Sequence, residues 1–161
     1  MRPADGPTLD VDLAALAENY RLLKKRHAKA NIAAVVKANA YGLGVEAVSR
    51  ALWQEGCREF FVGTLDEGIE LRGYLEQADI AVFNGLLAGE EEAYRRHQLT
   101  PILNTLEQTE RWRKVASLSS AALHVDTGIT RLGLSGSDAQ TLAASEANPQ
   151  FRLVMSHLAC S

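Results

Sequence analysis

Reactive side chains lie at or just past the ends of three apolar runs of the sequence. Lys37 ends the apolar run 32–36, and the segment "ANAYGLG" follows it immediately. A run without polar alternation is typical of a strand covered on both faces, and a lysine at its end costs desolvation unless it is used there. A partly desolvated lysine amine can attack a carbonyl carbon, which is the chemistry of a Schiff-base lysine. The later segment 124–131 and His157 also lie at or just past apolar runs.

Lys37 and Tyr41 could also have purely structural roles. Lys37 could simply extend its ammonium to solvent or to a carboxylate. Tyr41 could donate its hydroxyl to a phosphate, or it could be a core tyrosine with a satisfied hydroxyl. The segment after Lys37 adds a phenol and backbone freedom close to the lysine, and both alternatives stay open on these residues alone.

The elements that must position these residues alternate along the chain. Apolar runs predict strands at 32–37, 58–63, 79–85, 99–105, 121–128 and 151–159. Amphipathic or capped segments predict helices at 7–27, 44–56, 65–76, 89–98, 106–119 and 137–147. Asp12 and Ser137 are the expected caps of the first and last helices.

Strands that alternate with single helices indicate an α/β fold of parallel β/α units. A doubly wound sheet could stop after six units, whereas a closed (β/α)8 TIM-type barrel needs eight. The glycine patterns of dinucleotide-binding folds and of P-loops are absent, so an open nucleotide-binding sheet has no positive support. In either architecture the carboxyl ends of the strands carry the active site, where Lys37, segment 124–131 and His157 would meet.

The composition of the chain argues against several classes of protein. A chain of 161 residues with 47% hydrophobic residues is enough for one ordinary domain. Its net charge of −3 and lack of a basic face argue against nucleic acid. No run is long enough for a membrane span or resembles a signal peptide. Cys57 and Cys160 have no metal-type spacing and do not suggest a disulfide framework, so we expect no metal site and a cytoplasmic location.

Three segments together carry a resemblance to a known family. "AVVKANAYGLG", residues 34–44, resembles the cofactor-lysine motif of alanine racemases, fold-type III enzymes that use pyridoxal 5'-phosphate. "HVDTGITRLGL", residues 124–134, is similar to a second family segment, in which an arginine follows an Asp-Thr-Gly turn. "VMSHLACS", residues 154–161, is similar to a third, with a histidine near a strand end. The segments lie in the family's order, and the resemblance covers essentially the whole chain.

The resemblance implies a role for each matching residue. Lys37 would hold pyridoxal phosphate covalently and act as one of two catalytic bases. Tyr41 would bind the cofactor phosphate, and His157 would pack beside the pyridine ring. Arg131 would lie by the cofactor's phenolic oxygen and help bind the carboxylate of the substrate, alanine. The implied activity is interconversion of L- and D-alanine, which supplies cell-wall precursors.

Simpler explanations remain open for the last two of these residues. Arg131 could form a surface ion pair with Asp126 or Asp138, and His157 could be a satisfied core histidine. The sequence also departs from the family at His124, where many members have a lysine that can be carbamylated and then pairs with the arginine. A histidine cannot become that anion, so the sequence leaves the partner of Arg131 undetermined.

The last strand predicted lies at the end of the given sequence. The resemblance implies eight barrel strands followed by a C-terminal β-domain, so we expect residues 1–161 to be an incomplete N-terminal barrel domain. In the family, a tyrosine from the C-terminal domain of a partner subunit supplies the second base. A homodimer is therefore expected of the full-length enzyme, and residues 1–161 alone are expected to be inactive.

Two other functions stay open. One is a racemase or decarboxylase of the same fold with another substrate, which substrate profiling would distinguish. The other is a cofactor-binding barrel, or a fragment used for assembly, without racemase activity.

Overall fold

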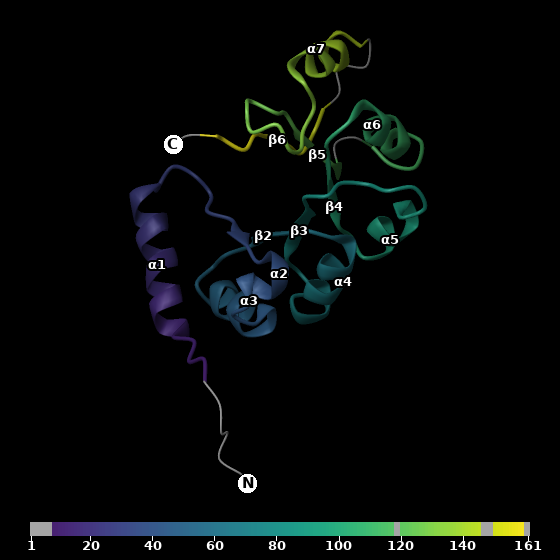
Figure 1. Ribbon diagram of the computed structural model, residues 1–161. Helices are drawn as coiled ribbons and strands as arrows, with labels where there is room; N and C mark the ends of the chain where they lie inside the picture. The colour runs from purple at the N-terminus through teal and green to yellow at the C-terminus, as the bar shows by residue number, and fades with distance from the viewer. Residues whose placement is uncertain (1–7, 118–119, 146–149, 160–161) are drawn as a thin grey trace.

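Six short strands alternate with helices in the computed structural model, which describes residues 8–117, 120–145 and 150–159 (Figure 1). The strands are β1 Ala34–Val35, β2 Glu59–Val62, β3 Asp79–Val82, β4 Thr100–Leu103, β5 Ala122–His124 and β6 Leu153–Met155. The helices are α1 Leu13–Arg26, α2 Lys37–Tyr41, α3 Val45–Gln54, α4 Leu65–Tyr74, α5 Glu91–Arg96, α6 Leu106–Arg113 and α7 Gly136–Ala144. At least one helix separates each strand from the next, as the sequence pattern predicts.

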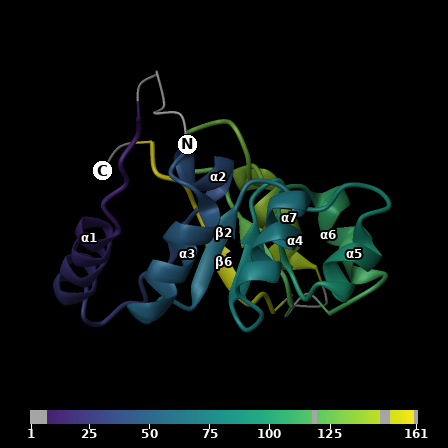
Figure 2. The ribbon, with the colours of Figure 1, turned by 90° about the horizontal axis from the view of Figure 1, so that it is seen from below.

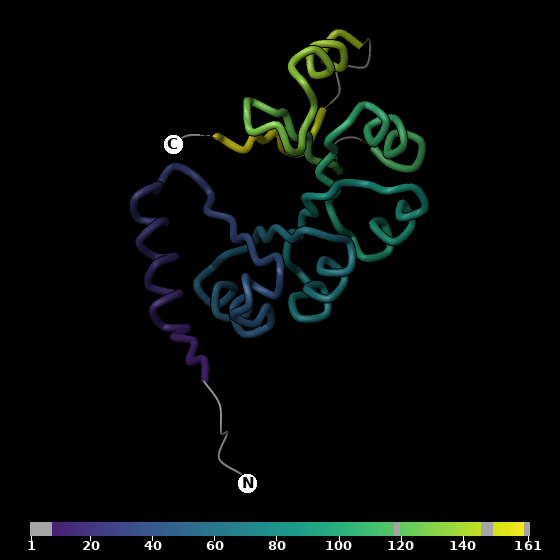
Figure 3. The backbone as a smooth tube through the Cα atoms, in the orientation of Figure 1, coloured from purple at the N-terminus to yellow at the C-terminus, as the bar shows by residue number. Residues whose placement is uncertain are grey.

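The strands form one parallel sheet in chain order, from β1 to β6. A doubly wound sheet would reverse its direction of growth, which this order does not do. The backbone trace instead runs round an arc, with helices α3 to α7 on its outer side and β1 and β6 at its two edges (Figure 3). The chain therefore has the layout of six consecutive units of a β/α barrel, the fold class predicted from sequence.

Side chains from the sheet pack into two apolar layers. The outward-facing residues Phe60, Val62, Ile80 and Val82 are almost fully buried against the helices. The inward-facing residues form a smaller cluster of Phe61, Ala81, Phe83, Ile102, Ala122 and Met155. Strands β3 to β5 are largely buried on both faces, which explains why their segments are apolar runs without alternation.

The predicted cap of the first helix is confirmed, whereas the predicted cap of the last helix is wrong. The side chain of Asp12 accepts two backbone N–H groups of α1, as expected. Helix α7, however, is capped by Ser135 and not by Ser137, since the Ser135 hydroxyl accepts the N–H of Asp138 at 3.1 Å. Ser137 lies inside the first turn, and its hydroxyl contacts that of Ser135 at 2.9 Å.

The strand predicted to reach Lys37 ends earlier. Only residues 34 and 35 pair with β2, and the N–H of Ala40 donates to the carbonyl of Val36 at 2.9 Å. The chain therefore turns as soon as it leaves the sheet, and Lys37 is the first residue of the short helix α2. Helix α1 packs against α3 beside the β1 edge (Figure 2). No helix in the described ranges is long and apolar enough to span a membrane.

Candidate active site

A cavity of about 590 Å³ opens at the carboxyl ends of the strands. Active sites of parallel β/α folds lie at this edge, because the loops that follow the strands converge there. The wall is formed by Val35, Lys37, Tyr41, Gly63, Phe83, Asn84, His124, Arg131, Leu132, Met155 and His157. It thus contains a lysine, an arginine and two imidazoles, but no carboxylate.

All four site residues predicted from the sequence line this cavity, namely Lys37, Tyr41, Arg131 and His157. Tyr41 is 64% exposed, and His157 is exposed as well, so neither is a buried core side chain. The fold thus gathers residues that are up to 120 positions apart in the sequence, 37 and 157. Their individual roles stay predictions.

Lys37 lines the cavity and lies over an aromatic ring. Its side chain is half-buried, and Nζ lies 5.7 Å from the centre of the Phe83 ring. Such a contact with a ring face is worth about 0.5–1 kcal/mol at a partly exposed site. Lys37 has no hydrogen bond or ion pair with any residue of the described ranges, so the expected alternative of a carboxylate partner is not observed. The amine remains available for a bond to a ligand.

The backbone directly after Lys37 is left-handed. Ala38, Asn39, Ala40 and Tyr41 have φ angles of 53° to 55°, and Gly42 continues with a φ of 87°. A left-handed conformation costs about 1–2 kcal/mol per residue for L-residues other than glycine. Strained backbone of this kind persists only where the surroundings hold it, and it is concentrated at functional sites.

Two side chains hold the left-handed turn in place. The Glu67 carboxylate accepts the N–H of Ala38 at 2.7 Å through Oε1 and the N–H of Gly63 at 2.7 Å through Oε2. Glu67 also forms the capping box of α4 with Thr64. On the other side of the turn, Asn39 Oδ1 accepts the N–H of Val45 at 2.8 Å, where α3 begins. Glu67 therefore fixes the segment beside Lys37 to the end of β2.

Arg131 lies on a loop that leaves β5 and returns to it. The Asp126 carboxylate accepts the N–H groups of Gly128 and Thr130 at 2.9 and 3.0 Å, and these bonds lower the pKa of Asp126. The loop closes where the N–H of Leu134 donates to the carbonyl of His124 at 2.8 Å. Among the described residues, Arg131 forms no ion pair, so the pairs with Asp126 or Asp138 are not observed.

Asn104 holds the His124 ring through a contact with its Nδ1 atom. The imidazole is only 4% exposed, and its Nδ1 lies 3.0 Å from Asn104 Oδ1. The Nε2 atom of His124 is buried and has no hydrogen-bond partner within residues 8–117, 120–145 and 150–159. Burial is the main cause that lowers the pKa of His124; the nearby charges of His157 and Arg131 lower it further, while Asp126 opposes them. The surroundings of the ring therefore favour its neutral form.

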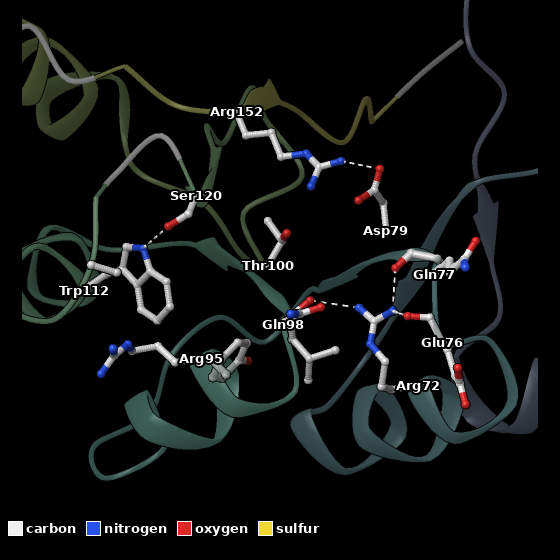
Figure 4. A pocket seen from close by; sticks show the side chains of 14 residues that line it. Arg72, Glu76, Gln77, Asp79, Arg95, Gln98, Thr100, Trp112, Ser120 and Arg152 are labelled. Atoms are coloured by element: carbon white, nitrogen blue, oxygen red, sulfur yellow. Dashed lines mark hydrogen bonds and ion pairs between the residues drawn. The ribbon is translucent and has the colours of Figure 1, made fainter.

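A second cavity, of about 510 Å³, lies at the opposite, amino ends of the strands (Figure 4). Its arginines are engaged in structural contacts. The Arg72 guanidinium donates five hydrogen bonds to the carbonyls of Leu75, Glu76, Ala78, His97 and Gln98. Arg152 pairs with Asp79 at 2.6 Å. Although the two cavities are of similar size, the one at the carboxyl ends presents Lys37 and Arg131, neither of which forms an ion pair with a described residue.

Sequence reasoning missed three residues that shape the site. Glu67 is the third helical residue after Thr64, a capping-box spacing that can be read from sequence, but its reach to Ala38 cannot. Asn104 and Phe83 have no sequence signal, because they act through contacts with distant residues. No group of three or more potential metal ligands occurs in the ranges that the structure describes.

The fold and the cavity define a β/α-barrel protein with a lysine-centred site that suits an anionic ligand. The family model for the alanine racemase N-terminal domain matches residues 11–161. The chain belongs to this family.

Curated relatives and solved structures agree with the family match. The chain is 45% identical over 159 residues to the biosynthetic alanine racemase of Agrobacterium fabrum, covering 95% of this chain and 41% of that protein. It is 45% identical over 161 residues to the alanine racemase of Rhizobium meliloti, covering 95% of this chain and 42% of that protein. The alanine racemase of Bartonella henselae, solved with covalently bound pyridoxal phosphate, superposes with a TM-score of 0.85 at 36% identity, over 92% of this chain and 46% of that one. The chain thus spans less than half the length of these proteins.

Proposed function

We propose that this chain is the cofactor-binding part of a pyridoxal 5'-phosphate-dependent alanine racemase. One observation carries the proposal: the Lys37 amine has no hydrogen-bond or ion-pair partner among the described residues and lies in a cavity whose wall offers N–H and O–H donors but no carboxylate. Such a wall suits a ligand that carries a phosphate and a carboxylate. The likeness to curated alanine racemases supports alanine as the substrate.

The residues present fit the cofactor by their chemistry. The Lys37 amine would bond to its aldehyde carbon, the Tyr41 hydroxyl would donate to its phosphate, and His157 would contact its ring. When bound, the cofactor supplies an electron sink that makes the Cα proton of an amino acid acidic.

The protein's own groups then bind the substrate and move the proton. Arg131 would hold the substrate carboxylate through its fork of donors, which fixes the direction of the Cα–H bond. Lys37 Nζ would take or return the proton on one face. Inversion needs a second group on the opposite face, and we assign it to a tyrosine of the partner subunit in a homodimer. We place the enzyme in the cytoplasm, where D-alanine would enter cell-wall precursors.

Lys37→Ala in the full-length protein tests the assignment directly. We expect the variant to lose both the covalent adduct with pyridoxal phosphate and the conversion of L-alanine to D-alanine, because no other described residue of the cavity wall carries an amine. The adduct is measured by borohydride reduction followed by peptide mass spectrometry, and conversion by chiral chromatography. A panel of other amino acids shows whether alanine is preferred.

Lys25→Ala is the matched control, since Lys25 lies on the exposed surface of α1. It should keep both the adduct and the activity. A reducible adduct on a lysine other than Lys37 would contradict the site. An adduct at Lys37 without conversion of alanine would keep the site and contradict the substrate or the reaction.

A further inference from the structure

One buried polar atom of the cavity wall has no partner among the described residues. His124 Nε2 is shielded from solvent, forms no hydrogen bond with the described part of the chain, and belongs to a side chain that lines the cavity. Buried polar atoms are nearly always paired, because an unpaired one loses its hydration without compensation. A hydrogen-bonding group therefore belongs opposite this atom when the site is in use.

The hydrogen bonds of Asn104 decide whether Nε2 donates or accepts. The Asn104 amide nitrogen donates to the carbonyls of Phe83 and Ile102, both at 2.9 Å, which uses both of its N–H groups. Its oxygen must then face His124 Nδ1, at 3.0 Å, so Nδ1 carries the proton and donates. In the neutral imidazole Nε2 is consequently an acceptor only.

The loop that carries Arg131 lies along the same edge of the ring. A Cβ atom on Gly133 would lie 3.2 Å from Cδ2 of His124, the carbon bonded to Nε2. Arg131 is two residues before Gly133, lines the same cavity and has no ion pair among the described residues. Among the side chains that line this cavity, the Arg131 guanidinium can offer Nε2 an N–H donor.

We propose that His124 is a positioning residue for Arg131, whose guanidinium donates an N–H to His124 Nε2. A neutral acceptor holds the guanidinium without neutralising it, so the full positive charge remains for an anionic group in the cavity. A carboxylate partner would cancel much of that charge. The use of this bond in racemisation rests on the proposed function, but the bond itself does not.

Protonation of His124 would reverse the role of Nε2. The charged groups that face the ring are Arg131 and Asp126 on the loop, His157 after β6, and Lys37 across the cavity. A proton on Nε2 would turn the acceptor into a donor that points at a guanidinium. The interaction thus requires the neutral ring with its proton on Nδ1.

The tautomer can be measured in the full-length protein by long-range 15N–1H correlation of its labelled histidines. The spectrum of His124→Gln identifies the His124 signals. We expect a neutral ring at neutral pH with the proton on Nδ1 and a bare Nε2. A proton on Nε2, or a charged ring, overturns the proposal.

Three variants test the link to Arg131 through its guanidinium NMR signals. In His124→Gln the amide oxygen can replace Nε2 as acceptor, whereas His124→Leu removes the acceptor. Asn104→Asp places a carboxylate at Nδ1, which favours the charged ring. In the wild type and in His124→Gln, we expect an Arg131 guanidinium N–H that exchanges slowly with solvent. In His124→Leu and Asn104→Asp, this slowly exchanging signal should be lost. Identical Arg131 signals in all four proteins overturn the proposal, and the two His124 variants decide the matter if Asn104→Asp fails to fold.

Kinetics with alanine then separate positioning from folding. Loss of the acceptor should raise KM about tenfold or more while kcat falls much less, because the carboxylate site is disordered and Lys37 is intact. His124→Gln should restore KM. If the protein does not racemise alanine at all, the proposed function fails while the NMR experiments still decide the role of His124.

Discussion

Both carboxylate oxygens of Glu67 accept backbone N–H groups from segments that leave neighbouring strands. Glu67→Gln keeps the shape of the side chain but turns one oxygen into a donor that faces an N–H group. We expect the free energy of unfolding to fall by about 1.5–3 kcal/mol, the usual worth of hydrogen bonds to a charged group. Urea denaturation of the full-length protein measures this change. The covalent cofactor yield at Lys37 should fall too, because Ala38 is no longer held.

Asp66→Asn is the matched control for Glu67. Asp66 is the preceding residue in the first turn of α4, is exposed, and has no hydrogen bond to another described residue. Its amide should change stability by less than about 1 kcal/mol, through the helix dipole alone. Equal losses in the two variants would mean that Glu67 acts only through its charge at the helix end.

His124 gives the protein a pH-dependent stability with a definite sign. Its pKa in the folded state lies below its ordinary value of 6.5, mainly because the ring is buried. As the pH falls through 6.5, the unfolded chain binds a proton that the folded chain does not. The contribution of His124 to the free energy of unfolding is therefore present at higher pH and is lost as the pH falls.

Comparing His124→Gln with the wild type isolates this contribution. Between about pH 7.5 and pH 5, the free energy of unfolding of the wild type should fall more steeply than that of the variant. Parallel curves over that range would show that His124 is not held neutral by its surroundings.

At the level of single elements, helix α2 reverses the usual effect of glycine. Ala38 is exposed and has a φ of 53°, a conformation that glycine adopts without strain. Ala38→Gly should therefore stabilise the folded protein by about 1 kcal/mol, despite the greater freedom of glycine in the unfolded chain. Thermal and urea unfolding measure the difference.

The opposite sign is expected in an ordinary helix. Ala51 lies in the middle of the right-handed helix α3, and Ala51→Gly should destabilise the protein by about 1 kcal/mol. If both glycine variants destabilise, the backbone at residue 38 is not left-handed in solution.

The strand and helix order could be predicted from the sequence because it depends on local patterns. Apolar runs and amphipathic segments recur at regular intervals, and three motifs mark the strand ends where Lys37, Arg131 and His157 lie. The handedness of α2 could not be predicted, since a stretch such as "KANAY" favours an ordinary helix by composition. The contacts of Glu67 and Asn104 depend on residues from other strands, which no local pattern encodes.

At the scale of the whole molecule, the two ends of the sheet differ in role. The amino ends carry structural contacts, and the carboxyl ends carry the candidate active site. At the amino ends, Arg72 ties the end of α4 to the segment after α5 through carbonyl groups (Figure 4). Arg72→Lys keeps the charge but offers fewer donors without the planar fork, so we expect a loss of about 2 kcal/mol in unfolding free energy.

Arg72→Lys also tests whether the amino-end cavity affects the candidate site at the carboxyl ends of the strands. The fraction of folded Arg72→Lys protein that carries the covalent cofactor at Lys37 should equal that of the wild type. Measuring the adduct by mass spectrometry at a temperature where both proteins are folded gives this fraction. A lower fraction would mean that the amino-end cavity influences the chemistry.

The left-handed turn after Lys37 has a consequence for chirality. The mirror image of a strained conformation for an L-residue is the relaxed helical conformation, so residues 38–41 follow the path that D-amino acids prefer. D-alanine incorporated at residue 38 or 40 by chemical ligation would keep the observed backbone and remove its strain. A chain proposed to be part of an enzyme that converts one enantiomer of alanine into the other thus has, beside its lysine, a backbone suited to the enantiomer that ribosomes do not incorporate.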